Sequence, residues 1–317
     1  MPWVCSICSS SNDNNNKKCY VCDSPRPGTG LTFDIVTQMR AYGTSISSLL
    51  DASRSVDLDE ECKRGEKELV SNPSGAFDIL MGCASRGHSI AQNKVGDCFY
   101  YGLGTEQNYS KAYIWFEKSA QQGLAQAQYN LGFCNLQGKG TIVNYGNAVF
   151  WFRKAAEQGH SDAQKELGDC YYYGKGVEKD LTAAFGWYIK SAESGNISGV
   201  INAGICYLKG DGIDEDEEKA YDFFLKAANQ GSMHAKYLLG KCVYNGWGTK
   251  ENHKKAATLF MEAAESGVAE AQYEIGRCYE SGEGVARSKD RAIAWYKKAI
   301  EQDHSDALKA YKRLLNC

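Results

Sequence analysis

Apolar residues recur along most of the chain at the three- and four-residue spacing of amphipathic helices. Ala127, Leu131 and Cys134 share one face of a helix predicted over 125–137, and a second helix with its own apolar face is predicted over 145–158. A Gly-x-Gly segment separates the two, and glycine readily takes the positive φ that ends a helix. This part of the chain is therefore predicted to form a helical hairpin.

The hairpin pattern repeats six times with a period of 36 residues and without insertion or deletion. Each copy contains a Gly-x-Cys triplet, whose cysteines are Cys98, Cys134, Cys170, Cys206, Cys242 and Cys278. Each second helix contains a large apolar pair such as Trp151-Phe152. One hairpin cannot bury its apolar face alone, so a stack of hairpins is predicted.

Partial units are predicted at both ends of the array. Residues 51–87 are interpreted as a degenerate N-terminal repeat, with a first helix over about 52–70, and residues 88–303 as the six full repeats. Residues 304–317 are interpreted as a C-terminal capping helix, because this segment keeps the apolar phase but is polar on its outer face.

The pattern AxxxLGxCYxxGxG…A…WFxKAAxxG resembles the Sel-1-like repeat, a relative of the tetratricopeptide repeat, over about residues 74–316. The resemblance implies an all-α fold, a right-handed superhelical solenoid of helix-turn-helix repeats with a concave binding surface. It also implies an adaptor that holds other proteins together.

Two Cys-x-x-Cys pairs near the N-terminus indicate a second, smaller module over 1–28, followed by a linker over 29–50. Four thiolates at this spacing are typical of one structural zinc ion. A module of ~25 residues is too small to fold around a core of its own, and zinc binding supplies the missing free energy. The predicted zinc ligands are Cys5, Cys8, Cys19 and Cys22.

Residues around these cysteines resemble the Ran-binding-protein-2-type (nucleoporin-type) zinc finger. The resemblance implies that Trp3 packs on the zinc core and that Asn12 ties the two knuckles together. Fingers of this family bind ubiquitin, the GTPase Ran or single-stranded RNA. Ser9-Ser10 replaces the Thr-Phe pair of ubiquitin binders and the Leu-Val pair of Ran binders, and Asp13 replaces the aromatic residue of RNA binders. A purely structural finger therefore stays open beside all three ligands.

Composition narrows the classes of function. A sequence pI of about 6.0 differs from that of a protein coated in nucleic acid, whose binding domain is usually basic. No apolar run reaches the ~18 residues of a membrane helix, and the first residues lack the features of a signal peptide. We therefore expect a cytoplasmic or nuclear protein without a membrane partner.

The histidines and cysteines form no catalytic signature in the sequence. His88, His160 and His304 fall in matching turns and are interpreted as exposed turn residues, and the six periodic cysteines as buried core residues rather than metal ligands. No nucleophile has a neighbouring base in the sequence, so neither an enzyme nor a small-molecule substrate is predicted.

Positions that vary between repeats are free to bind a partner. Two positions on the first helix of each repeat, four residues apart, form two variable rows. One row is Asp97, Phe133, Asp169, Ile205, Lys241 and Arg277, and the other is Tyr101, Gln137, Tyr173, Lys209, Asn245 and Ser281. The rows are acidic and tyrosine-bearing early and basic late, and tyrosine is enriched at contact surfaces. Partner binding here and simple solvent exposure both stay open.

The sequence thus favours a non-enzymatic protein-interaction scaffold with a tethered zinc finger. The alternative is a ubiquitin-, Ran- or RNA-binding finger for which the solenoid is a spacer.

Overall fold

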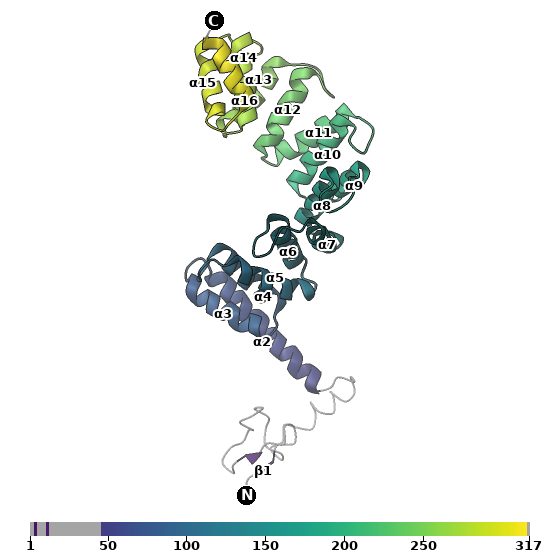
Figure 1. Ribbon diagram of the computed structural model, residues 1–317, viewed down its shortest axis with the longest axis vertical. Helices are drawn as coiled ribbons and strands as arrows, with labels where there is room; N and C mark the ends of the chain where they lie inside the picture. The colour runs from purple at the N-terminus through teal and green to yellow at the C-terminus, as the bar shows by residue number, and fades with distance from the viewer. Residues whose placement is uncertain (1–2, 5–10, 13–45, 316–317) are drawn as a thin grey trace, which may run out of the picture. The chain divides into compact units, whose positions relative to one another are not determined.

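The computed structural model describes residues 3–4, 11–12 and 46–315, and divides into two compact units, 1–65 and 66–317 (Figure 1). In the first unit, strand β1 (Trp3–Val4) pairs antiparallel with strand β2 (Ser11–Asn12), with Trp3 opposite Asn12. The predicted zinc ligands Cys5, Cys8, Cys19 and Cys22 lie outside the described residues, so the zinc site stays a prediction.

Helices make up most of the described chain. Their bounds are α2 (Ile46–Glu68), α3 (Pro73–Ser85), α4 (Ser89–Tyr101), α5 (Tyr109–Gln121), α6 (Ala125–Gln137), α7 (Tyr145–Glu157), α8 (Ser161–Tyr173), α9 (Leu181–Glu193), α10 (Ile197–Lys209), α11 (Glu217–Asn229), α12 (Met233–Asn245), α13 (His253–Glu265), α14 (Ala269–Ser281), α15 (Lys289–Ile300) and α16 (Ser305–Leu315). None of these helices is long and apolar enough to span a bilayer.

Helices α4 to α15 form six hairpins, and each helix packs against the helix that precedes it and the helix that follows it. Even-numbered helices from α4 to α14 are the first helices of their repeats, and odd-numbered helices from α5 to α15 are the second helices. The predicted stack of hairpins is confirmed, and α6 has the predicted bounds. The right-handed superhelical sense stays a prediction.

In each hairpin, the start of the second helix and the end of the first helix lie at residues whose chemistry determines the boundary. All six second helices begin after an N-cap side chain that accepts a hydrogen bond from the backbone amide three residues later. These N-caps are Asn108, Asn144, Asp180, Asp216, Asn252 and Ser288. All six first helices end at a glycine in the left-handed conformation, such as Gly138 with φ of 69°. Residues 214–218 are all acidic, and Asp216 among them caps α11.

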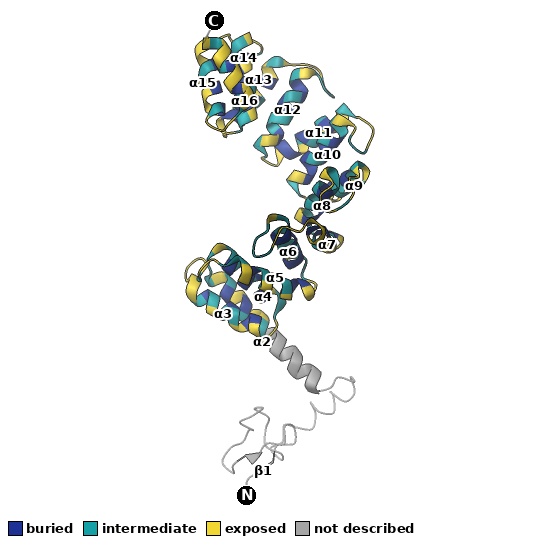
Figure 2. Ribbon diagram, in the orientation of Figure 1, coloured by how far each residue is buried: buried dark blue, intermediate teal, exposed yellow. Residues whose placement is uncertain are grey.

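The core of each repeat forms where an aromatic ring lies against the glycine of the Gly-x-Cys triplet. A Cβ atom on Gly132 would lie 2.7 Å from the Phe152 ring, and Phe152 is fully buried. The six periodic cysteines are buried and free, as predicted. Buried positions line the inner faces of the hairpins, as Figure 2 shows in dark blue.

Neighbouring repeats are joined by the second glycine of each Gly-x-Gly segment. Gly140, with φ of 75°, lies against the carbonyl of Tyr109, the first residue of the preceding second helix. The same contact recurs along the array between Gly104 and Pro73, Gly176 and Tyr145, Gly212 and Leu181, Gly248 and Glu217, and Gly284 and His253. The turn therefore serves both as a helix end and as the seam between repeats.

A row of buried glutamines also joins the layers. Gln128 donates to the Ala120 carbonyl and accepts a hydrogen bond of 2.7 Å from Gln158. The pairs Gln92–Gln122 and Gln272–Gln302 repeat this bond. Gln164 has Ser194 at the partner position instead, and its Oε1 accepts no hydrogen bond from any described residue.

The ends of the array differ from the repeats. Helix α2 begins at Ile46, earlier than the predicted start near residue 52, and is 23 residues long. At the other end, Asp303 has φ of 60° where the preceding five repeats have glycine. Helix α16 packs against α15 with Ala307 and Ala310 buried, and its role as a cap over residues 304–317 stays a prediction.

Candidate docking surface on the first helices

The two variable rows lie on one face of the first helices, since residues four apart on a helix share a face. Tyr101 and Tyr173 are 66% and 63% exposed, whereas Asp97 and Asp169 are half-buried at the base of this face. In the early repeats the rows therefore combine exposed tyrosines with half-buried aspartates beneath them.

Four cavities open between successive first helices, and members of the variable rows line all four. The Asp97 pocket contains Asp97, Tyr101 and Phe133, and the Asp169 pocket contains Asp169, Tyr173, Ile205 and Lys209. The Trp247 pocket contains Ile205, Lys209 and Lys241, and the C-terminal pocket contains Arg277 and Ser281. Gln137 and Asn245 line none of these four, and Gln137 is exposed.

The Asp97 pocket, of about 150 Å³, combines one carboxylate with aromatic walls. Asn130, from the next repeat, donates to Asp97 Oδ1 at 3.3 Å, and Asn93 donates to Oδ2 at 3.4 Å. Burial raises the pKa of Asp97 to about 6, against a smaller opposing effect of Lys94. The carboxylate is thus held by two long hydrogen bonds and is poorly solvated.

The Asp169 pocket has the same volume, about 150 Å³, but its carboxylate is fully engaged. Lys165 forms an ion pair with Asp169 Oδ2 at 2.8 Å, and the Tyr188 hydroxyl donates to Oδ1 at 2.7 Å. Asn202 also donates to Oδ1, at 3.3 Å. A cation within the repeat therefore neutralises this carboxylate.

The Trp247 pocket, of about 440 Å³, is lined equally by apolar and by charged side chains. Leu208, Leu238 and Trp247 surround it, and Lys209 and Lys241 lie at its edge with Glu215 and Glu217. A pocket of this kind suits a large apolar side chain next to charged groups.

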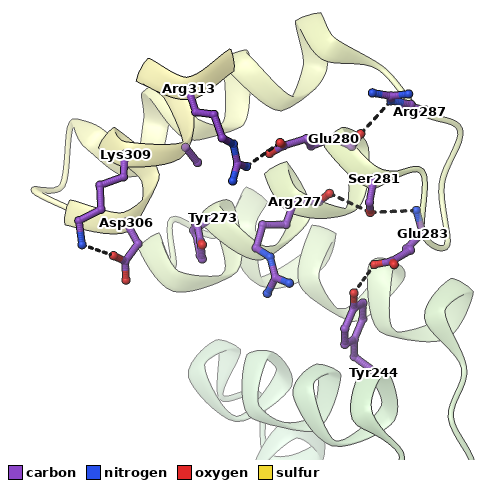
Figure 3. Close-up of a pocket in the computed structure, with 11 residues that line it drawn as sticks. Tyr244, Tyr273, Arg277, Glu280, Ser281, Glu283, Arg287, Asp306, Lys309 and Arg313 are labelled. Carbon is purple, nitrogen blue, oxygen red and sulfur yellow. Dashed lines mark hydrogen bonds and ion pairs between the residues drawn. The ribbon is translucent and has the colours of Figure 1, made fainter. Parts of the chain in front are cut away.

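The C-terminal pocket, of about 630 Å³, is strongly charged (Figure 3). Arg313 pairs with Glu280 at 2.6 Å, Lys309 pairs with Asp306 at 2.9 Å, and the Tyr244 hydroxyl donates to Glu283. Its lining contains four basic and three acidic side chains. The surface thus changes from acidic and aromatic at the Asp97 pocket to mixed charge, with one basic side chain in excess, at the C-terminal pocket.

Several lining residues were missed by the sequence argument. Tyr100, Tyr129 and Asn130 line the Asp97 pocket, and Tyr172 and Asn202 hold equivalent places in the Asp169 pocket. Asn130 and Asn202 are 72 residues apart, which is the signal that could have identified them.

Three histidines lie in the turns before first helices, as predicted, but the prediction that they are exposed is wrong. His88, His160 and His304 are half-buried, and each Nδ1 accepts a hydrogen bond from the backbone amide three residues later, at the start of a first helix. His160 also contacts Gln126 through Nε2 at 3.1 Å, and burial lowers its pKa. These histidines cap helices.

The periodic cysteines have the environment of core residues. Burial raises the pKa of Cys134 to about 12, so the thiol stays protonated at neutral pH. Within the part of the chain that the structure describes, no three histidine, cysteine, aspartate or glutamate side chains are grouped to hold a metal ion.

Comparison with known proteins identifies the repeat. The Sel1 repeat model matches residues 89–124, 125–160, 161–196, 198–232, 234–268 and 269–304. A search of curated proteins finds no match.

Two solved structures share the arrangement. One is a protective antigen present in uropathogenic Escherichia coli strains, which displays an SLR fold, with 31% identity and a TM-score of 0.72. The match covers 86% of this chain and 59% of the E. coli chain. The other is a Sel1 repeat protein from Oxalobacter formigenes, with 29% identity and a TM-score of 0.71 over 75% of this chain and 96% of that one.

Proposed function

Because the chain belongs to the Sel1 repeat family, whose members are generally scaffolds for protein–protein interaction, we propose that it is a non-enzymatic adaptor that docks partner proteins on its first helices. One observation carries the proposal: the four cavities between successive first helices are each lined by residues of the variable rows. Residues that recur build the core, and residues that vary line the hollows where a partner's side chains fit.

The charge change along the surface supports an oriented partner. A segment lying along the first helices would meet an acidic, aromatic pocket first and a pocket of mixed charge, with arginine and lysine side chains, last. Complementary charge fixes the direction of binding and speeds association.

Affinity purification with paired charge reversals tests the docking surface. We expect Lys241→Glu with Arg277→Glu to lose partners that the full chain retains, because both residues line cavities on the first helices. The matched control is Lys254→Glu with Lys255→Glu, two exposed lysines on the second helix α13. Equal loss of partners in both double variants, or in neither, would refute docking on the first helices.

We further propose that residues 1–28 form a structural zinc finger with Cys5, Cys8, Cys19 and Cys22 as ligands. The antiparallel pairing of Trp3–Val4 with Ser11–Asn12 supports it, since these strands bracket the first two cysteines and place Trp3 opposite Asn12. Elemental analysis of the purified chain is expected to find one zinc per molecule. Cys5→Ser with Cys8→Ser should abolish that zinc, whereas Cys98→Ser should leave it unchanged.

Binding assays on the same purified chain test which ligand the finger binds. Saturable binding of ubiquitin, Ran or single-stranded RNA that needs the four cysteines would make the finger the main binding module and the solenoid its spacer. Binding of none of them leaves the solenoid as the docking element.

We propose a cytoplasmic or nuclear location, which imaging of the tagged full chain tests.

A further inference from the structure

Two of the four pockets are copies of each other with one chemical difference. Asp97, Tyr100 and Tyr101 correspond to Asp169, Tyr172 and Tyr173, two repeats later, and Asn130 corresponds to Asn202. Both pockets have a half-buried carboxylate at the base, an exposed tyrosine at the rim and an asparagine from the next repeat. The shared geometry allows the charge balance of the two to be compared directly.

The difference lies in the residue four positions before each aspartate. Lys165 fills that position in the later pocket and pairs with Asp169 at 2.8 Å, whereas Asn93 fills it in the earlier pocket and donates to Asp97 at 3.4 Å. Lys209 adds a second cation to the lining of the later pocket. The Asp169 pocket thus contains its own counter-charge.

The Asp97 pocket has no counter-charge of its own. No lysine, arginine or histidine is among its lining residues, and no ion pair reaches Asp97 from the described residues. Lys94, the nearest basic neighbour along the helix, offsets only part of the effect of burial on Asp97, and its own ion pair is with Glu66 at 3.8 Å. A half-buried carboxylate without a paired cation is costly, and a ligand that supplies that cation recovers the cost.

The walls of the pocket suit the same ligand. Tyr100 and Tyr101 meet edge to face with ring centroids 4.9 Å apart, and Tyr129 and Phe133 from the next repeat complete the lining. Aromatic faces attract a cation through their quadrupole, and they contact the methylene groups of a long side chain at the same time. A neutral side chain would not neutralise the charge of Asp97, and an acidic side chain would be repelled by it.

From this geometry we propose that the Asp97 pocket is a socket for one basic side chain, lysine or arginine, of a partner protein docked on the first helices. The inference rests on the proposed docking function and specifies which kind of partner side chain binds in the Asp97 pocket. Asp97 binds the cationic group, and Tyr101 at the rim contacts the aliphatic part of the side chain. The Asp169 pocket does not bind a further cation, because Lys165 already neutralises Asp169.

Ligand-observed saturation-transfer NMR on the full chain tests the socket, with n-butylammonium as the probe for a lysine side chain. At constant ionic strength, we expect saturable binding of n-butylammonium and of n-butylguanidinium, but not of the neutral analogue n-butanol. Asp97→Asn should weaken n-butylammonium binding about tenfold, since it removes the charge from a charge-assisted hydrogen bond. Asparagine keeps an acceptor for Asn130, so this variant is expected to fold.

Two exposed tyrosines provide a matched pair that does not depend on the folding of the Asp97 variant. Tyr101→Ala should weaken n-butylammonium binding, whereas Tyr173→Ala, at the same place in the neutralised pocket, should leave it unchanged. Equal binding of n-butanol, or equal effects of the two tyrosine variants, would overturn the socket. If the socket fails while Lys241→Glu with Arg277→Glu still loses partners, docking on the first helices stands. If those reversals lose no partner, the docking function itself fails, whatever n-butylammonium does.

Discussion

Gly140 lies so close to the backbone of Tyr109 that a Cβ atom on it would overlap the Tyr109 carbonyl oxygen. The two residues are in successive repeats, and the contact recurs at every seam of the array. Because the obstacle is backbone rather than a movable side chain, neighbouring repeats can approach this closely only if glycine is present.

Gly140→Ala is therefore expected to lower the free energy of unfolding by about 3 kcal/mol, from the overlap together with the strain of alanine at positive φ. Gly159→Ala has positive φ but open space around its Cβ, so we expect a loss of only about 1 kcal/mol. Gly186→Ala, on an exposed helical position with neither problem, should stabilise by about 0.5–1 kcal/mol. Denaturant unfolding followed by circular dichroism measures all three, and equal losses for Gly140 and Gly159 would contradict a backbone seam.

Ser194→Gln is expected to stabilise the protein. A glutamine at this position can donate to the unpaired Oε1 of Gln164, as Gln158 donates to Gln128. An unsatisfied buried acceptor costs about 1–3 kcal/mol, so recovery of part of that cost should raise the unfolding midpoint. Ser266→Gln is the control, because Lys236 stands opposite it in place of a glutamine. The explanation fails if both variants raise the midpoint equally.

Local chemistry explains why the sequence predicted the helices so closely. The bounds of α6 depend on Ala125 following a turn and on Gly138 ending the helix, and both signals lie within the segment itself. The seam contact between Gly140 and Tyr109 joins residues 31 positions apart, so the sequence could indicate the glycine but not its second role.

The candidate site was predicted less completely for the same reason. The variable rows located Asp97 and Tyr101, but the depth of the pocket comes from Tyr129 and Asn130 in the next repeat. The histidines were misinterpreted because an imidazole is an unusual N-cap, and only the placement of Nδ1 reveals that role. The zinc ligands stay a prediction, outside the described residues.

His160 is expected to make stability depend on pH. Its Nδ1 accepts from the Ala163 amide, and burial holds the pKa of His160 below that of the unfolded chain. The unfolded chain therefore binds the proton first, and this contribution to stability is present above the unfolded pKa and is lost as pH falls below it. His160→Asn should remove that slope and keep the cap, because Asn196 caps the equivalent helix of the next repeat. Unfolding midpoints between about pH 5 and 8 test this, and an unchanged slope in His160→Asn would contradict it.

Cys134 is expected to resist alkylation in the folded protein. Its side chain is 1% exposed, and burial raises the pKa of its thiol to about 12. Peptide mapping by mass spectrometry after a thiol reagent should find Cys98, Cys134, Cys170, Cys206, Cys242 and Cys278 unmodified until denaturant is added. Rapid labelling of any of the six in native buffer would contradict the core assignment for that repeat.

Asp97 is expected to destabilise the protein at neutral pH. Burial raises its folded pKa to about 6 from an ordinary value of 3.8, so the folded chain binds a proton more readily than the unfolded chain. The protonation of Asp97 should therefore increase the free energy of unfolding as pH falls from about 6 towards 4. Because the site is only half-buried, we expect Asp97→Asn to stabilise by about 1 kcal/mol at pH 7.5, and by much less near pH 4.

Asp169→Asn is the contrasting variant and should destabilise at pH 7.5, since it breaks the ion pair with Lys165. Unfolding midpoints of both variants across this pH range make the comparison. Opposite signs would show that the earlier pocket contains a carboxylate without its counter-charge, whereas destabilisation by both would mean that Asp97 already has a cation. The stabilisation measured for Asp97→Asn at pH 7.5 then gives the free energy that a basic side chain of a partner can recover when it binds Asp97.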